Sequence, residues 1–300
     1  VGSEMCIRDR PSSGGVCLNQ MMKMIEPYDI KAMGHNTQKS IQLMVEAERR
    51  SYADRSEFLG DPDFVDVPLN IVLDSLYIQK KMSSFDSNRA TPSSEIKAGD
   101  SYYFESDETT HFSIVDDQGN AVAVTTTLNG GYGSKVFVEE LGVFMNNEMD
   151  DFSSKPGVPN MFGLVGNEAN AIAPKKRMLS SMTPTIAEKN GKLYLVVGSP
   201  GGSTIITSVF QTILNVYEHN LPIQEAVNAA RFHHQWLPDF ITFEPNQFEP
   251  SLLQSLNEMG YAGEEKNSRI IGKVDAILVD DSGQISLGAD RRGDDTAVSY

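Results

Sequence analysis

The chain has 300 residues, 40% of them hydrophobic and 22% charged, a composition typical of globular proteins and unlike that of disordered or collagen-like chains. Acidic residues (41) outnumber basic ones (25), and the formal net charge of −16 disfavours nucleic acid and anionic membrane surfaces as partners. Its two cysteines are too few to staple a fold of this size and lack the spacing of a zinc or redox motif, and no apolar run reaches the ~18 residues that a membrane-spanning helix needs.

The first third of the chain predicts helices. Residues 1–10 follow no periodicity, and we interpret them as a non-native junction. A Met-rich apolar run covers 17–25, and Asn36 and Thr37 are typical caps for the helix that follows. The core face of that helix is predicted to hold Ile41, Met44, Val45 and Ala47.

A further helix is predicted to begin at Pro68. Its apolar core stripe is expected to consist of Ile71, Val72, Leu76 and Tyr77. The stretch 85–101 is rich in Ser, Pro, Asp and Asn, and it predicts an exposed linker before the first strand.

From there on, the pattern predicts strand hairpins mixed with helices. The strand pairs are 111–115 with 121–127, 185–188 with 192–197, and 274–279 with 284–287, each joined by a turn that contains glycine. Helices are predicted at 203–217, from Pro222 to about 230, and from Pro250 to 259. This mixture indicates a layered α+β domain and not an alternating βαβ sheet.

Three segments have the composition of chemical sites, but each also has a structural interpretation. The turn 198–202 (GSPGG) precedes a helix and lacks the lysine of a phosphate loop, so a tight turn and an oxyanion hole are the alternatives. The acidic turn 146–151 (NNEMDD) does not match a calcium loop; a solvated turn, a glycosidase pair and an ammonium site stay open. His233 and His234 point to opposite faces of a strand, which favours structural histidines over metal ligands.

Thr109 stands between a polar stretch and a predicted strand. A threonine in this place is ordinarily just the start of the strand. It becomes a nucleophile only if its own α-amino group is free to act as the base, which requires cleavage of the Glu108–Thr109 peptide bond. His111 has no GxSxG elbow nearby, so a serine–histidine triad is not favoured.

Nine segments in a fixed order carry a resemblance to a known family. They are PSSGG (11–15), YADRSEFLGDPDFV (52–65), PSSEIKAG (92–99), TTHFSIVD (109–116), GNAVAVTTTLN (119–129), NNEMDDFSSKPGVPN (146–160), KRMLSSMTPTI (176–186), GSPGGSTIIT (198–207) and RFHHQWLPD (231–239). Together they resemble the γ-glutamyltransferases (γ-glutamyl transpeptidases), self-cleaving members of the N-terminal nucleophile hydrolases. The resemblance implies a four-layer αββα sandwich, truncated at its N-terminus, and no metal or organic cofactor.

The resemblance also implies a mechanism. The precursor is expected to cut itself before Thr109, which becomes the N-terminal nucleophile with its α-amine as the base. Thr127 is expected to bond the hydroxyl of the nucleophile, and the backbone amides of Gly201 and Gly202 to form the oxyanion hole. The hydroxyl attacks the γ-carbonyl of glutathione or another γ-glutamyl compound, and the ester then passes to water or to the amine of an amino acid or peptide.

The acidic turn gains a role by the same resemblance. Glu148 and Asp151, with the side-chain amide of Asn129, are expected to bind the α-ammonium group of glutamate. Ser180 and Ser181 are expected to bind its α-carboxylate, together with an arginine from a family region upstream of the one that this chain matches.

Residues 11–108 correspond in the resemblance to the end of a large subunit, and 109–300 to a complete small subunit of the same precursor. Residues 159–174 resemble a lid loop, in which Phe162 replaces a tyrosine that often bonds the asparagine at the position of Asn129. The resemblance implies a periplasmic or secreted protein. The alternatives are a cephalosporin-acylase-like amidohydrolase, a binding protein without the cut, and an inactive truncated fragment.

Overall fold

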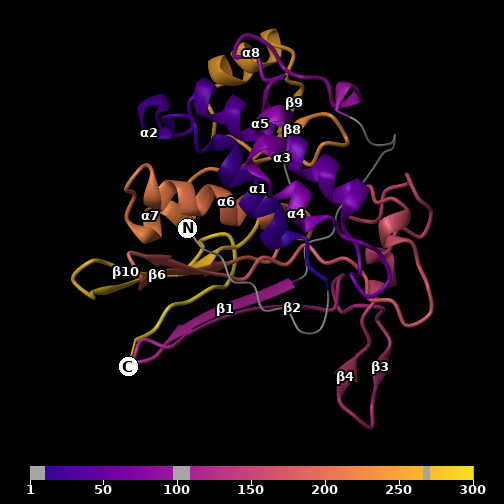
Figure 1. Ribbon diagram of the computed structural model, residues 1–300. Helices are drawn as coiled ribbons and strands as arrows, with labels where there is room; N and C mark the ends of the chain where they lie inside the picture. Colours follow the sequence, from indigo (N-terminus) through magenta and orange to yellow (C-terminus); the bar gives the residue numbers. More distant parts are fainter. Residues whose placement is uncertain (1–10, 97–108, 266–270, 300) are drawn as a thin grey trace.

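The computed structural model describes residues 11–96, 109–265 and 271–299 (Figure 1). Residues 1–10, interpreted above as a junction, lie outside these ranges. Up to residue 96 the described chain is helical, with α1 (Gly14–Ile25), α2 (Ile30–Met33), α3 (Gln38–Phe58), α4 (Leu69–Val72), α5 (Ser75–Met82) and a 3-10 turn at Ser93–Glu95.

The second part of the chain mixes strands and helices, as predicted. Its strands are β1 (Thr109–Val115), β2 (Ala121–Thr127), β3 (Phe137–Val138), β4 (Val143–Phe144), β5 (Thr185–Lys189), β6 (Lys192–Gly198), β7 (Phe232–His233), β8 (Ile241–Phe243), β9 (Gly263–Glu265), β10 (Asp275–Val279) and β11 (Ile285–Gly288). Its helices are α6 (Thr204–Tyr217), α7 (Ile223–Asn228) and α8 (Pro250–Glu258), with 3-10 turns at Glu148–Asp151 and Glu168–Asn170. The three predicted hairpins and the helices that begin near 203, 222 and 250 are confirmed.

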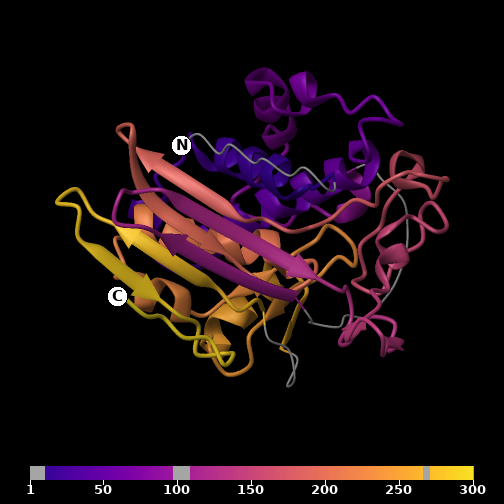
Figure 2. The ribbon, with the colours of Figure 1, turned by 90° about the horizontal axis from the view of Figure 1, so that it is seen from below.

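Figure 2 shows how these elements form layers. The antiparallel β1–β2 hairpin stacks on an antiparallel sheet with the strand order β11-β10-β6-β5. α6 and α7 pack on the opposite face of that sheet, α1 packs on α6, and α3 packs on α1. The layered α+β architecture is confirmed, and its main hydrophobic core lies between the four-stranded sheet and these helices.

The outer face of the β1–β2 hairpin carries apolar side chains. Phe112, Ile114 and Val122 project from this face and are 43–48% exposed. Of the four layers that the resemblance implies, the described ranges therefore contain the two sheets and one helical layer.

The prediction of a capped helix after Thr37 is confirmed, and the four residues predicted for its core face are all buried, but the burial extends to its other faces. Thr37 and Ser40 form a reciprocal capping box at the start of α3. Every residue from Ser40 to Ser56 is buried, including acidic and basic ones. The helices α1, α2 and α8 pack against α3, and α5 is bonded to it through Asp54. Glu46, for example, pairs inside the fold with Arg49 and Arg50.

The helix predicted to begin at Pro68 is confirmed at its start, where Pro68 is the N-cap of α4, but one continuous helix with a single apolar stripe is wrong. Asp74 accepts hydrogen bonds from the N–H groups of Leu76 and Tyr77, and this new N-cap starts α5 after α4 has ended. Because of this break, the side chains of α4 and α5 do not form one continuous face. Val72 is buried, whereas Ile71 and Leu76 are exposed to 51% and 74%.

The stretch 85–101 is only partly the exposed linker that we expected. Its residues 97–101 lie outside the described ranges, but Thr91, Ser93 and Ile96 are buried. The Ser93 hydroxyl donates to the carbonyl of Trp236 over 2.6 Å, and the indole N–H of Trp236 donates to the carbonyls of Ser93 and Ile96. The stretch is therefore fastened to the second part of the chain before it reaches the segment that leads to Thr109.

Candidate functional site

Thr109 begins β1 directly opposite Thr127, the last residue of β2. The Thr109 hydroxyl donates to Oγ1 of Thr127 over 3.1 Å, and the same Oγ1 accepts the backbone N–H of Asn129 over 2.9 Å. Asn129 is buried and has φ +78°, a left-handed conformation that asparagine adopts more readily than most residues. The structure thus brings the predicted nucleophile, its predicted partner and one predicted substrate ligand together at one end of the hairpin.

His111 lies on the same face of the hairpin as Thr109. Its Nδ1 is 2.8 Å from Oγ1 of Thr125 and its Nε2 is 3.0 Å from Oγ of Ser113, so both ring nitrogens are engaged away from Thr109. The ring lies against Gly198, where an added Cβ would come within 2.3 Å of it. Burial lowers the pKa of His111 to about 4, so the neutral ring packs the hairpin against the turn that begins at Gly198.

Acid is expected to destabilise the protein through His111. The pKa of about 4 in the folded chain lies below the ordinary value of 6.5, so the unfolded chain binds more protons between these pH values. The free energy of unfolding therefore falls as the pH is lowered from 6.5 to 4, and His111 contributes roughly 2 kcal/mol of this loss between pH 7 and 5. Urea unfolding at pH 7 and pH 5 measures the loss of unfolding free energy in the unsubstituted protein and in His111→Gln. The loss should be smaller in His111→Gln by about that amount. An equal loss in both proteins would contradict this assignment.

The turn 198–202 is tightly confined at the N-terminus of α6. Gly201 has φ +134° and Gly202 has φ +53°. The Thr204 hydroxyl donates to the carbonyl of Gly201 over 2.7 Å, and a Cβ on Gly202 would lie 2.5 Å from the ring of Phe162. Of the interpretations left open by the sequence, this geometry favours an oxyanion hole, because consecutive N–H groups of a rigid turn at a helix N-terminus suit a developing negative charge.

The segment that resembles a lid, 159–174, reaches both the turn and Asn129. Phe162 is buried against Gly202, and the Asn160 side chain accepts the backbone N–H of Phe162. The amide Nδ2 of Asn129 lies 3.4 Å from Sδ of Met161. The contact between this segment and Asn129 thus involves the thioether of Met161, next to Phe162.

The acidic turn is joined to the same end of the hairpin. Glu148 and Asp151 lie on the 3-10 turn, where Glu148 is buried and Asp151 half-buried. Just before this turn, the carbonyl of Asn147 accepts Nδ2 of Asn129 over 3.2 Å. The predicted ammonium ligands are therefore linked to Asn129 through Asn147.

Asn170 connects the acidic turn to the predicted carboxylate-binding serines. Its Nδ2 donates to the carbonyl of Asp151 over 2.7 Å, and its Oδ1 accepts the N–H of Leu179 over 3.0 Å. Leu179 directly precedes Ser180, so one buried amide fixes the spacing between the two groups of predicted ligands.

Arg55 of α3 is hydrogen-bonded to the segment that contains Ser180 and Ser181. Its Nη2 donates to Oγ of Ser181 over 3.2 Å, and its Nε donates to Oγ of Ser13 over 2.9 Å. The Ser13 hydroxyl in turn donates to the carbonyl of Ser180. Burial lowers the pKa of Arg55, and the carboxylate of Asp151 acts in the opposite direction. Ser180 itself is buried, and its Oγ accepts a backbone N–H two residues later.

The histidines of the segment 231–239 are built into the core. His233 is bonded to Thr207 at Nδ1 and to Gln235 at Nε2, both over 2.8 Å. The N–H of His234 donates to the buried carboxyl of Glu48, and burial lowers the pKa of the His234 ring to about 4. Both side chains are packed and hydrogen-bonded inside the protein, which supports their structural interpretation.

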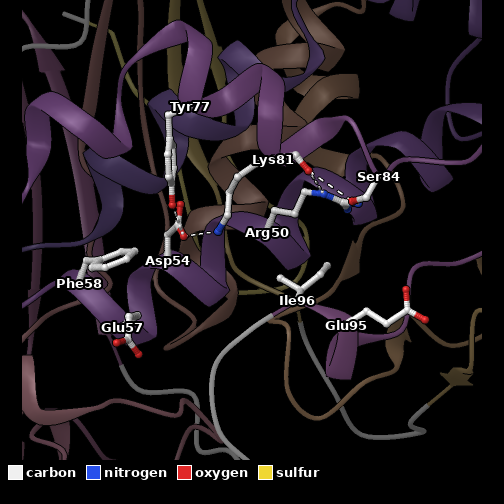
Figure 3. A pocket seen from close by; sticks show the side chains of 9 residues that line it. All are labelled: Arg50, Asp54, Glu57, Phe58, Tyr77, Lys81, Ser84, Glu95 and Ile96. Atoms are coloured by element: carbon white, nitrogen blue, oxygen red, sulfur yellow. Dashed lines mark hydrogen bonds and ion pairs between the residues drawn. The ribbon is translucent and has the colours of Figure 1, made fainter.

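A pocket of about 590 Å³ lies elsewhere, between α3, α5 and the turn near residue 95 (Figure 3). Asp54 is bonded there to Lys81 and Tyr77, and Arg50 is bonded to Ser84. The pocket contains none of the predicted site residues. Since its central charges are already paired, we do not assign the chemistry to it.

The sequence analysis missed four residues that organise this site. They are Ser13, Tyr52, Arg55 and Asn170. Three of them stand in segments that carry the resemblance, which was the available signal. Nothing in the local pattern separates a buried Arg55 from the exposed charges of an ordinary helix.

The model of one protein family, described as gamma-glutamyltranspeptidase, matches residues 2–300. The glutathione hydrolase proenzyme of Escherichia coli (strain K12) is 47% identical over 291 residues, which are 97% of this chain and 50% of that protein. The acylase ACY 1 proenzyme of Pseudomonas sp. (strain SE83) is 32% identical, over 96% of this chain and 49% of that protein. The chain thus spans about half the length of the curated relatives that it matches.

Solved structures of gamma-glutamyltranspeptidases and acylases are also similar to this chain. A gamma-glutamyltranspeptidase from Pseudomonas nitroreducens, in complex with L-DON, is 48% identical with a TM-score of 0.61, and the match covers 64% of this chain and 99% of that one. A cephalosporin acylase from Bacillus halodurans is 19% identical with a TM-score of 0.82, over 100% of this chain and 53% of that one, and at this identity it shows the fold alone.

Proposed function

The chain belongs to the gamma-glutamyltranspeptidase family and has an N-terminal nucleophile hydrolase fold, and we propose that it cuts itself before Thr109 and then transfers γ-glutamyl groups. The observation that carries this proposal is the hydrogen bond from the hydroxyl of Thr109, the first residue of β1, to the hydroxyl of Thr127. The division at Thr109 has further support. Residues 109–300 make up 64% of the chain, the same share that the solved Pseudomonas nitroreducens chain matches over 99% of its length.

In this mechanism, cleavage frees the α-amine of Thr109, which accepts the proton of its own hydroxyl. The oxygen then attacks the γ-carbonyl of glutathione or a related γ-glutamyl compound, and an ester forms as the amine leaves with the proton. Water or another amine reverses the step and releases the γ-glutamyl group. Thr127 orients the nucleophile before the attack, because its Oγ1 accepts a hydrogen bond from the Thr109 hydroxyl.

We assign the backbone N–H groups of Gly201 and Gly202 to stabilise the negative charge that develops on the carbonyl oxygen. The confined turn supports this role because its dipoles need no reorganisation during the reaction. We assign the α-ammonium of the substrate to Glu148, Asp151 and Asn129, and its α-carboxylate to Ser180 and Ser181. The links through Asn147, Asn170 and Arg55 support one continuous substrate site.

The rival function is that of an acylase acting on a different acyl group. One observation favours it: the acylase ACY 1 proenzyme is 32% identical to this chain. The retained set of Asn129, Glu148 and Asp151 favours γ-glutamyl substrates instead, because a buried carboxylate such as Glu148 suits a substrate cation.

Glutaryl-p-nitroanilide separates these two functions because it lacks only the α-ammonium group of γ-glutamyl-p-nitroanilide. We expect kcat/KM to be at least about 100-fold higher for the γ-glutamyl compound, since glutaryl lacks the ammonium group that the polar side chains of the proposed site would bind. Release of p-nitroaniline from both compounds measures this ratio. Equal rates, or a preference for glutaryl, would favour the acylase.

Replacement of Phe162 by tyrosine is expected to alter the fate of the γ-glutamyl ester. The ring already packs on Gly202 beside the Met161–Asn129 contact. We expect an added hydroxyl to hydrogen-bond near Asn129, as the family resemblance implies, and to hold the segment 159–174 more firmly over the site. A better closed lid admits less water, so we expect the ratio of transfer to hydrolysis to rise about twofold. Product analysis with glycylglycine as acceptor measures this ratio, and an unchanged ratio would contradict the role assigned to the lid.

We further propose that residues 11–108 and 109–300 form the two subunits of one precursor and that the protein acts in the periplasm or outside the cell. The family resemblance supports both assignments. Among the helices of the described ranges, none is long and apolar enough to cross a membrane.

A further inference from the structure

Tyr52 lies near the middle of α3, beneath the turn that precedes α6. Its side chain is 2% exposed, and its hydroxyl donates to the backbone carbonyl of Ser203 over 2.5 Å. The edge of its ring packs against His233, with a centroid distance of 5.8 Å and an interplanar angle of 83°. Tyr52 thus reaches from the helical layer to the residue that directly follows Gly202.

The bonded carbonyl has a special position in the chain. Ser203 is the N-cap of α6, so its carbonyl is already the first acceptor of the helix. The Tyr52 hydroxyl is an added donor, supplied from 151 residues away. A merely structural α6 can form without it.

Several other contacts that fix this turn come from the second part of the chain. Thr204 bonds the carbonyl of Gly201, and the N–H of Lys273 donates to Oγ of Ser199 over 3.0 Å. Phe162 closes the turn from the lid side. Tyr52 adds a contact from the first part, on the carbonyl of the residue that directly follows Gly202.

We propose that Tyr52 is a positioning residue that aligns the oxyanion hole by holding the Ser203 carbonyl. This inference rests on the proposed function. The held carbonyl fixes the Ser203–Thr204 peptide group, where the turn enters α6. This limits how far Gly201 and Gly202, two residues and one residue before Ser203, can reorient their N–H groups during the reaction. After a cut before Thr109, Tyr52 and Ser203 belong to different polypeptides, so the subunit contact itself tunes the hole.

The test is Tyr52→Phe, which removes only the hydroxyl. We expect the rate constant for acylation by γ-glutamyl-p-nitroanilide, measured as the first burst of p-nitroaniline, to fall about tenfold. The inhibition constant of glutamate, a ground-state ligand, should stay within twofold. Hydrogen exchange followed by mass spectrometry should show faster exchange in the 199–205 amides, with the rest of the chain unchanged.

Tyr77→Phe is the matched control. It also removes a hydroxyl that packs against α3, where Tyr77 donates to Asp54 over 2.9 Å, but it lies in the pocket of Figure 3. We expect it to change neither acylation nor exchange in 199–205.

Two results would overturn the role of Tyr52. One is unchanged exchange of the 199–205 amides in Tyr52→Phe, and the other is a loss of glutamate binding as large as the loss of acylation rate. If the unsubstituted protein has no turnover at all, the proposed function fails instead, while the exchange measurement still decides whether Tyr52 holds the turn.

Discussion

Thr109→Ala should leave the chain in one piece and lower γ-glutamyl turnover by at least about 1,000-fold, because both the attack on the peptide bond and the attack on the substrate use the same hydroxyl. The Thr109 hydroxyl already points to Thr127, and alanine removes the only oxygen of that side chain. Electrophoresis under denaturing conditions and release of p-nitroaniline measure the two effects.

Two further variants make this test specific. Thr110 is the next residue of β1, but it is exposed and points to the opposite face of the hairpin. Thr110→Ala should therefore cut and turn over normally. Thr109→Ser keeps a hydroxyl and should retain measurable cleavage and turnover. If Thr109→Ala cut itself and turned over substrate normally, the nucleophile would have to be another residue.

Gly201→Ala should lower turnover by about 100-fold or more while the protein still folds. A φ of +134° is accessible to glycine and not to alanine, and the new Cβ would lie 2.5 Å from Oγ1 of Thr204 and 3.1 Å from the backbone of Gly272. The turn has to shift, and losing one oxyanion donor costs roughly 3–4 kcal/mol of transition-state stabilisation. Steady-state kinetics with γ-glutamyl-p-nitroanilide measures the effect.

Gly191→Ala is the control for the cost of a positive φ alone. Gly191 has φ +73° in the turn between β5 and β6, with no other group within 4 Å of the added Cβ. It should cost about 1 kcal/mol of folding free energy and leave turnover unchanged. Equal effects of Gly191→Ala and Gly201→Ala on turnover would mean that the turn at 201 acts only through stability.

The sequence predicted best those elements that local chemistry decides. The Asn190–Gly191 turn has positive φ at both residues, as a tight hairpin requires, and Thr37 caps α3 with its own hydroxyl. These preferences act within a few residues, so no knowledge of the rest of the fold is needed.

The errors came from tertiary packing. α3 is dense in charged residues, which is typical of an exposed face. Inside the fold, however, Glu46 pairs with Arg49 and Arg50, and Asp239 supplies a second carboxylate for Arg49. The burial of these charges depends on the elements that pack around α3, and a local sequence pattern does not contain that information. Leu76 shows the reverse case, an apolar residue left exposed because Asp74 starts a new helix with a different rotation.

For the site, the residue pattern alone kept several alternatives open, and the resemblance to a family narrowed them. It named Thr109, Thr127 and the turn at Gly201. In the structure Thr109 is bonded to Thr127, and the segment with Met161 and Phe162 contacts both Asn129 and Gly202. It did not name Tyr52 or Arg55. Their contacts with Ser203 and Ser181 span more than 100 residues and become visible only when α3 lies beneath the second part of the chain.

The most direct test of the central claim is the mass of the purified protein, together with N-terminal sequencing. Cleavage before Thr109 predicts two polypeptides of 108 and 192 residues, the second beginning Thr-Thr-His-Phe. A chain that stays at 300 residues, or a cut at a different bond, would contradict the claim that Thr109 is released as the nucleophile.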